Sequence, residues 1–238
     1  MTEIIDSDVE KNISMRFCAH LERVGRLAIS REDEHSTVEV IKNLENFGKS
    51  TAERGLEDAT LQAGASLGLI GSTAAEKELK LGTWEAVMSL VSVGRTAAKK
   101  GLESATLLAA WSLGEVGRTA AEKGFEVAAS QAARSLREVG RIAAGKGLKV
   151  ATREAAESLI GVGIAAAKKE LEDVTGEAVE FLAELTILSE EIVNTAIHDY
   201  KLEEKGPDTF EKFIKIYEQE LEKLRAEKRT ANKKTEGR

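Results

Sequence analysis

The chain has 238 residues, a length that fits one large domain or one extended array of repeats. Aromatic residues make up only 4% of it and alanine supplies much of the apolar content, so its helices must pack closely. A single cysteine excludes an internal disulfide. The lack of a secretory leader or a long apolar span favours a cytoplasmic protein with no membrane partner.

Residues 1–47 are predicted to form an N-terminal helical cap and a degenerate repeat. A capping box at Ser7 and Glu10 opens the first helix, and a charged loop at 31–34 follows it. Atypical terminal units are expected because the ends of an array need polar caps. The apolar residues of this helix share one face: Val9, Ile13, Phe17, Leu21 and Val24.

Residues 48–185 are predicted to form an array built on a 23-residue repeat. A glycine recurs at this interval without interruption, and a leucine precedes each of these glycines by four residues. The first series is Gly25, Gly48, Gly71, Gly94, Gly117, Gly140 and Gly163. A second series, seven residues later, comprises Gly55, Gly101, Gly124 and Gly147, with Glu78 and Glu170 at two equivalent positions. A period of this length predicts units that stack on their neighbours.

Each unit is predicted to contain two helices joined by glycine turns. Thr73 precedes Glu76 by three residues and Thr119 precedes Glu122 likewise, a capping-box pattern that predicts a helix start after each first-series glycine. A short helix of about six residues would then end at the second-series position, where a following Leu or Phe completes a glycine C-cap. A helix of about fourteen residues would follow, because the apolar stripe is interrupted at the next first-series glycine.

The segment SLGEVG at residues 112–117 resembles the end of the second helix in HEAT-like repeats, where small residues close one helix against the next. The resemblance covers six residues of a unit, and the period here is shorter than in that family. It implies an array of stacked helices and no activity. The predicted fold is all-α: an α-solenoid of about seven 23-residue two-helix repeats with atypical helical caps at both ends.

Residues 186–227 are predicted to be C-terminal helices. A long helix would run from Glu177 to about Glu204, and a second would start after Pro207. This last helix would either pack back on the array or serve as a partner or dimerisation helix. Residues 228–238 form a basic tail without an apolar period and are predicted to be disordered. The apolar stripe of the last helix comprises Phe210, Phe213, Ile214, Tyr217, Leu221 and Leu224.

No catalytic, cofactor-binding or metal-binding residue is predicted. His20, His35 and His198 lie far apart, and no Cys or His cluster has the spacing of metal ligands. Cys18 is interpreted as a partly buried core residue. The Gly-Arg-Thr segments lack the longer glycine-rich run and the Lys-Ser/Thr ending of a nucleotide-binding loop. We therefore expect a protein without enzymatic activity.

A basic block occupies residues 94–153, with 11 basic and 5 acidic side chains in a chain of net charge −7. Its cations recur at fixed unit positions, so they are predicted to stack as a ladder near helix N-termini, where anions bind. The alternative is plain solvation, with Arg stems covering apolar surface and Lys serving helix C-termini. The ladder residues are Arg95, Arg118 and Arg141 in one row and Lys100, Lys123 and Lys146 in another.

The leading prediction is a non-enzymatic repeat scaffold that binds another protein, because stacked helices make extended surfaces and no chemical site competes. The first alternative is nucleic-acid or polyanion binding through the ladder in residues 94–153. The second is a self-assembling structural protein, a homo-oligomer in which stacking faces join arrays or the last helix pairs with its copy. No cofactor is expected.

Overall fold

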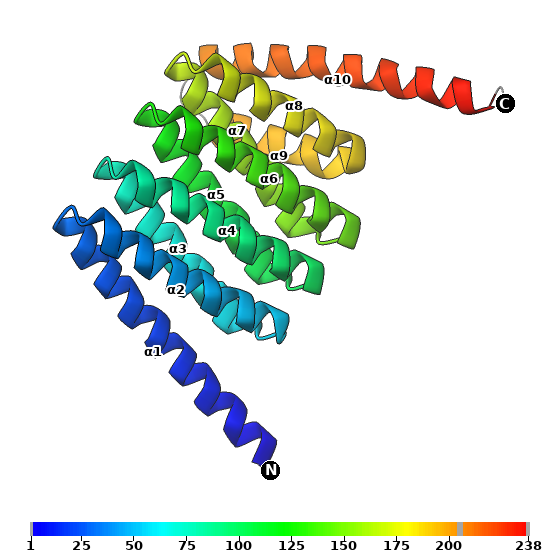
Figure 1. Ribbon diagram of the computed structural model, residues 1–238. Coiled ribbons are helices and arrows are strands. Elements are labelled where there is room, and N and C mark those ends of the chain that lie inside the picture. Colours follow the sequence, from blue (N-terminus) through cyan, green and yellow to red (C-terminus); the bar gives the residue numbers. More distant parts are fainter. Residues whose placement is uncertain (1, 204–206, 237–238) are drawn as a thin grey trace.

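The computed structural model describes residues 2–203 and 207–236, and all of its regular structure is helical (Figure 1). The helices follow one another with turns of a few residues between them. They are α1 (Thr2–Ser30), α2 (Glu34–Glu53), α3 (Glu57–Glu76), α4 (Lys80–Lys100), α5 (Glu103–Glu122), α6 (Glu126–Lys146), α7 (Lys149–Lys168), α8 (Glu172–Leu188), α9 (Glu190–Glu203) and α10 (Pro207–Glu236).

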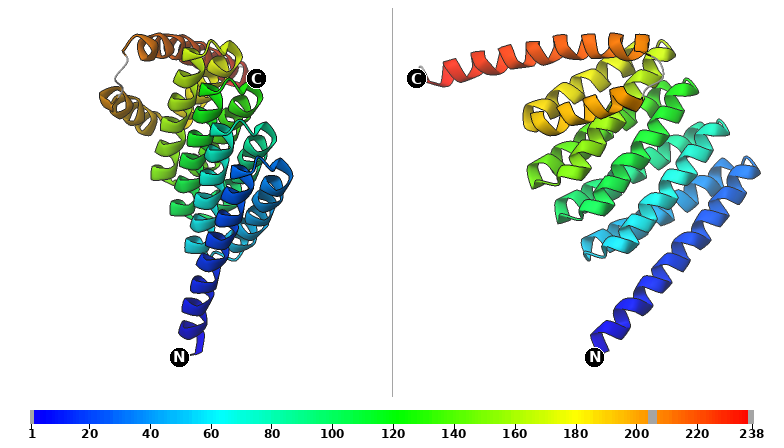
Figure 2. Two further views of the ribbon diagram at one scale, coloured as in Figure 1. Left: turned by 90° about the vertical axis from the view of Figure 1, so that its left-hand side faces the viewer. Right: turned by 180° about the vertical axis from the view of Figure 1, so that it is seen from behind.

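The helices form two layers, since each of α1 to α8 packs against the next helix and against the one after it. We call α1, α3, α5 and α7 the odd layer and α2, α4, α6 and α8 the even layer (Figure 2). Helix α9 continues the odd layer against α7, and α10 packs against α8. The all-α class and the repeated array of helices are confirmed.

One unit of 23 residues is one helix plus one turn, so the prediction of two helices in each unit is wrong. Gly94, Gly117 and Gly140 lie inside α4, α5 and α6, which continue through them. The hydroxyls of Thr73 and Thr119, expected to cap helix starts, instead donate hydrogen bonds to the carbonyl oxygens of Leu69 and Glu115 one turn earlier. Each helix packs against neighbours in both layers, so its buried residues cover a wide part of its circumference. The narrow apolar stripe predicted from the sequence is therefore interrupted at the first-series glycine although the helix continues.

The first-series glycines lie where three helices meet. A Cβ atom at Gly94 would come within 2.8 Å of Cβ of Ala109 in the following helix and 3.4 Å of Cγ2 of Val139 two helices on. Gly48 and Gly71 have neighbours at the equivalent positions. The repeated leucine lies one turn earlier and is fully buried in six helices. These are Leu44, Leu67, Leu90, Leu113, Leu136 and Leu159.

The turns between helices lie at the second-series positions, as predicted. Gly101 has φ +76°, the left-handed conformation of a helix C-cap, and the amide of Leu102 donates to the carbonyl of Ala97, 3.0 Å away. The same pattern recurs where the sequence has glutamate, because Glu78 and Glu170 have φ +62° and +59°. Every turn from α1 to α8 therefore has the same Schellman geometry.

The starts of α4, α5 and α7 are capped from the helix two positions earlier in the chain. The N-cap residues of these three helices, Leu79, Leu102 and Leu148, make no side-chain cap, whereas Asp33 at the N-cap of α2 accepts a hydrogen bond from the amide of Ser36. A glutamate at the first position of one helix instead accepts a hydrogen bond from a free amide of the next helix in its layer. The amides of Leu81, Ser104 and Val150 donate to Oε1 of Glu34, Glu57 and Glu103 at 2.9, 2.8 and 3.0 Å.

The C-terminal helices differ from the prediction in their bounds. Helix α8 starts at Glu172 and ends at Leu188, and a new helix, α9, begins after Ser189. No single helix therefore runs from Glu177 to Glu204. Helix α10 continues to Glu236, so residues 228–236 are helical where disorder was expected. Ala, Glu, Lys and Arg are strong helix formers, which extends the helix past its packed part. The predicted boundaries at 47/48 and 185/186 fall inside α2 and α8.

Candidate functional site

The predicted arginine ladder is divided between the two layers. Arg95 and Arg141 lie on α4 and α6 of the even layer, whereas Arg118 lies on α5 of the odd layer. All three lie in the C-terminal half of their helices, away from the N-terminal amides that were expected to favour anions. The expectation of one continuous row beside helix N-termini is therefore wrong, because consecutive units alternate between layers.

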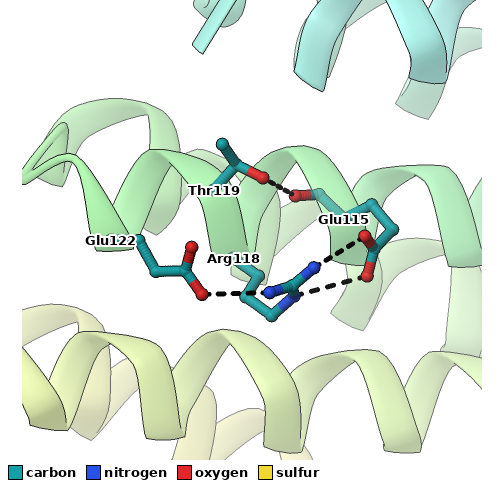
Figure 3. Close-up of polar contacts among 4 residues, drawn as sticks. All are labelled: Glu115, Arg118, Thr119 and Glu122. Carbon is teal, nitrogen blue, oxygen red and sulfur yellow. Dashed lines mark hydrogen bonds and ion pairs between the residues drawn. The ribbon is translucent and has the colours of Figure 1, made fainter. Parts of the chain in front are cut away.

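Arg118 is held by two carboxylates of its own helix (Figure 3). Its Nη2 and Nε donate to Oε2 and Oε1 of Glu115 at 2.8 and 3.3 Å, and its Nη1 donates to Oε1 of Glu122 at 3.0 Å. The hydrogen bonds to Glu115 raise the pKa of Arg118 above its usual value. Two carboxylates around one guanidinium leave a local negative charge, which does not favour an anionic ligand.

The other ladder residues have varied surroundings. Nε of Arg95 lies 3.0 Å from Oε1 of Glu138 in α6, and Nζ of Lys123 lies 3.6 Å from Oε1 of Glu78. Arg141 is exposed on α6 and forms no ion pair within the described residues. Lys100 and Lys146 are exposed at the ends of α4 and α6, where they suit the negative ends of the helix dipoles.

The basic block faces the acidic segment that follows it. Arg134 of α6 pairs with Glu177 of α8, and Nε of Arg137 lies 2.5 Å from Oε2 of Glu184 in α8. The guanidinium of Arg137 also stacks 4.8 Å from the ring of Phe181. Part of the uneven charge along the sequence is therefore neutralised between helices of one layer, by pairs of residues 43 and 47 positions apart.

The exposed apolar side chains of α3 and α5 gather on the outer side of the odd layer. Met15, Leu61 and Leu107 occupy one repeat position on α1, α3 and α5, and all are at least partly exposed. Trp111 is 49% exposed one turn after Leu107, and Leu69 is 39% exposed on α3. We call these five residues the Trp111 face. Trp84, the other tryptophan, lies on α4 in the even layer.

The helices of the odd layer approach one another closely beneath this face. A Cβ atom at Gly68 of α3 would lie 2.7 Å from Cβ of Ser112 in α5, and Gly114 meets Ser158 of α7 in the same way. The equivalent position in α4 is Val91, a larger residue. Small residues at these contacts let the backbones of α3, α5 and α7 nearly touch, which makes their outer side a continuous surface.

On α7 the surface next to this face becomes charged. Arg153 takes the position of Leu107, and its Nε and Nη2 lie 2.7 Å from Oε1 of Glu157 and from Oδ2 of Asp199 in α9. Glu154 is largely buried beside them. Burial, with the charge of Glu157, raises the pKa of Glu154 from 4.5 to about 7. The Trp111 face therefore ends at α7.

The clefts of the surface are shallow and charged. One of about 520 Å³ between α6 and α8 is lined by groups such as Ser130, Glu172 and Glu177. Another of about 340 Å³ includes Arg118 and Tyr200. In the described part of the chain, His, Cys, Asp and Glu form no cluster of three or more that could hold a metal ion. Cys18 is fully buried, and burial raises the pKa of its thiol to about 12.

The apolar stripe of α10 is used inside the protein. Helix α10 packs against α8 and α7, and the Tyr217 hydroxyl lies 2.9 Å from Oγ1 of Thr186 in α8. This arrangement corresponds to the cap that packs back on the array. Phe210, Phe213, Tyr217 and Leu221 are buried, and Ile214 and Leu224 are partly buried against the core.

No protein-family model, curated protein or solved structure gives a significant match to this chain. Within residues 2–203 and 207–236, no helix combines the length and apolar character needed to cross a membrane.

Proposed function

We propose that the protein is a non-enzymatic α-solenoid scaffold that binds another protein through the Trp111 face. The observation that carries the proposal is Trp111 itself, a large aromatic side chain that is half exposed in the middle of an array whose apolar residues are mostly aliphatic. Exposed tryptophans surrounded by aliphatic residues are the usual anchors of protein interfaces. Stacked helices also supply an extended surface that needs no rearrangement on binding.

The charge layout supports a protein partner over a polyanion. Arg95 and Arg118 already contact carboxylates, and the arginines of α6 pair with glutamates of α8. A polyanion would have to displace these carboxylates, whereas an apolar partner segment on the Trp111 face displaces only water. The partner expected is an amphipathic helix or extended segment that presents apolar side chains to Leu107 and Trp111.

The test is affinity purification of the tagged protein from a native lysate, with and without nuclease, followed by quantitative mass spectrometry. Trp111→Ala should reduce the yield of a specific partner by about tenfold or more, as removal of an interface anchor does. Trp84→Ala is the matched control, because Trp84 is also a partly exposed tryptophan but lies in the other layer.

Two results would contradict the proposal. Equal losses with Trp84→Ala and Trp111→Ala would show that the odd-layer surface is not the binding face. Partners that disappear after nuclease treatment would favour nucleic-acid binding, and their yield should then fall steeply with salt.

A further inference from the structure

Helix α1 is the first helix of the odd layer in the described part of the chain. Val24 occupies the repeat position of Val93, Val116 and Val139, which are fully buried and contact a glycine two helices earlier in the chain. Among the described residues no glycine takes this place beside α1, and Val24 is 38% exposed. The surface that in α3 to α8 receives the two preceding helices is therefore open in α1.

This open surface is largely apolar, although the end of an array is expected to be polar. The exposed His20 interrupts it between Phe17 and Val24, and the ring of Phe17 also lies 5.0 Å from that of Phe47 in α2. Val9, Ile13, Phe17, Val24 and Leu27 are spaced by 4, 4, 7 and 3 residues, which places them along one side of the helix. Ile13 is 63% exposed, the most open of the five. We call these residues the α1 stripe. It differs from the Trp111 face, which lies on the outer side of the layer.

Charge along α1 is divided between its two ends. Residues 2–10 contain Glu3, Asp6, Asp8 and Glu10 and no basic residue. Residues 11–30 contain Lys11, Arg16, Arg23 and Arg26 with one acidic residue, Glu22. A second helix with the same sequence complements this pattern only when it runs antiparallel, because its acidic end then lies beside the basic end of the first.

We propose that α1 pairs with α1 of a second copy of this chain, antiparallel and about a two-fold axis. Ile13 of one copy then lies opposite Phe17 of the other, and Val9 of one lies near Val24 of the other. The α1 stripes of the two copies therefore bury each other. The N-terminal part of α1 projects beyond the array in Figure 1, which leaves it accessible to the second copy. The two arrays join end to end at α1, and the interaction does not depend on the Trp111 face.

The C-terminal end does not offer an equivalent partner surface. Helix α10 covers that end, and its outward side within 208–225 is largely charged, with Lys212, Lys215 and Glu218 exposed. Head-to-tail stacking would place the apolar stripe of α1 against these charges, at the cost of their desolvation. Stacking of that kind would also remain open-ended, whereas a two-fold contact closes at the dimer.

The test is sedimentation-velocity ultracentrifugation of the full chain from about 1 μM to about 1 mM, with hydrogen exchange of α1 measured in parallel. The expected result is a monomer–dimer equilibrium in which the largest species is the dimer. The dissociation constant should rise with salt, and amide hydrogen exchange in α1 should be slower in the dimer. The variant Ile13→Glu should raise the dissociation constant by about 30-fold or more. Because Ile13 is mostly exposed, the helicity of the variant, measured by circular dichroism, should equal that of the parent protein.

Val127→Glu is the control, since Val127 is 73% exposed on α6, far along the array from α1. It should leave the dissociation constant unchanged. A chain that is monomeric throughout the concentration range would overturn the proposal, and so would assembly that continues past the dimer. An equal loss of dimer with Ile13→Glu and Val127→Glu would also refute it.

Discussion

Gly117 of α5 lies so close to Val162 of α7 that a Cβ atom there would be 2.9 Å from Cγ2 of the valine. The same Cβ would lie 2.6 Å from Cβ of Ala132 in α6. Gly117→Ala should therefore destabilise the protein by about 1–2 kcal/mol, because the cost of overpacking exceeds the gain in helix propensity. The shift would be measured as a lower urea midpoint by circular dichroism.

Gly145→Ala is the matched control for this substitution. Gly145 is also inside a helix, but a Cβ there would meet nothing within 4 Å. Replacement by alanine should stabilise α6 by about 0.5–1 kcal/mol through helix propensity alone. If both variants shifted the midpoint in the same direction, close packing at the three-helix contact would not be the reason for the first-series glycines.

Glu170 adopts φ +59° in the turn between α7 and α8, a conformation that strains residues with a Cβ. Glu170→Gly should stabilise the protein by about 1 kcal/mol. The opposite change at the same repeat position is Gly124→Ala, where φ is +73°, and it should destabilise by a similar amount. Urea unfolding of both variants checks this, and a destabilised Glu170→Gly would argue against strain at the turn.

The capping of one helix by another predicts an unusual long-range effect. Glu57→Ala removes the acceptor for the amide of Ser104, and should cost about 1 kcal/mol. Hydrogen exchange should increase at the start of α5, 46 residues away in the sequence. Glu172→Ala controls for the helix dipole, because Glu172 also begins a helix but caps no other helix in the described part. Faster exchange at α5 in both variants would contradict the assignment.

Glu154 predicts a dependence of stability on pH. Its pKa is raised from 4.5 to about 7 in the folded protein, so folding favours the protonated acid. Its contribution to stability is complete below pH 4.5 and is lost as the pH rises through about 7. Glu154→Gln, which stays neutral, should match the parent near pH 4.5 and be more stable at about pH 8. An equal difference at both pH values would contradict the shift.

Much of the fold could be predicted from local sequence. The 23-residue period, the helical class and the C-cap at the second-series position depend on residues adjacent in the chain, such as Lys100 and Gly101. The helical continuity through Gly94 could not be predicted in this way. From the sequence alone a glycine within a helix suggests a turn. Its actual role depends on contacts with Ala109 and Val139, 15 and 45 residues later, which the sequence does not show.

The charged site was predicted less well for the same reason. Arg95 and Arg118 hold equivalent places in the sequence, but consecutive helices lie in opposite layers. Arg95 pairs with Glu138, which lies 43 residues later in another helix, whereas Arg118 pairs with Glu115, which lies three residues earlier in the same helix. The neighbours of Trp111 on its face, such as Leu61 and Leu107, are brought together only by the spacing of 46 residues between helices of one layer.

Because consecutive helices alternate between the two layers, adding or removing an odd or an even number of helices has different consequences. Removing 46 residues, two complete units, would shorten the protein and leave every later helix on its original side. Removing one unit of 23 residues would exchange the sides of all later helices, move their positions equivalent to Trp111 to the even layer, and break the carboxylate caps that join helices on either side of the cut. Viable natural or engineered length variants of this chain should therefore differ by even numbers of helices.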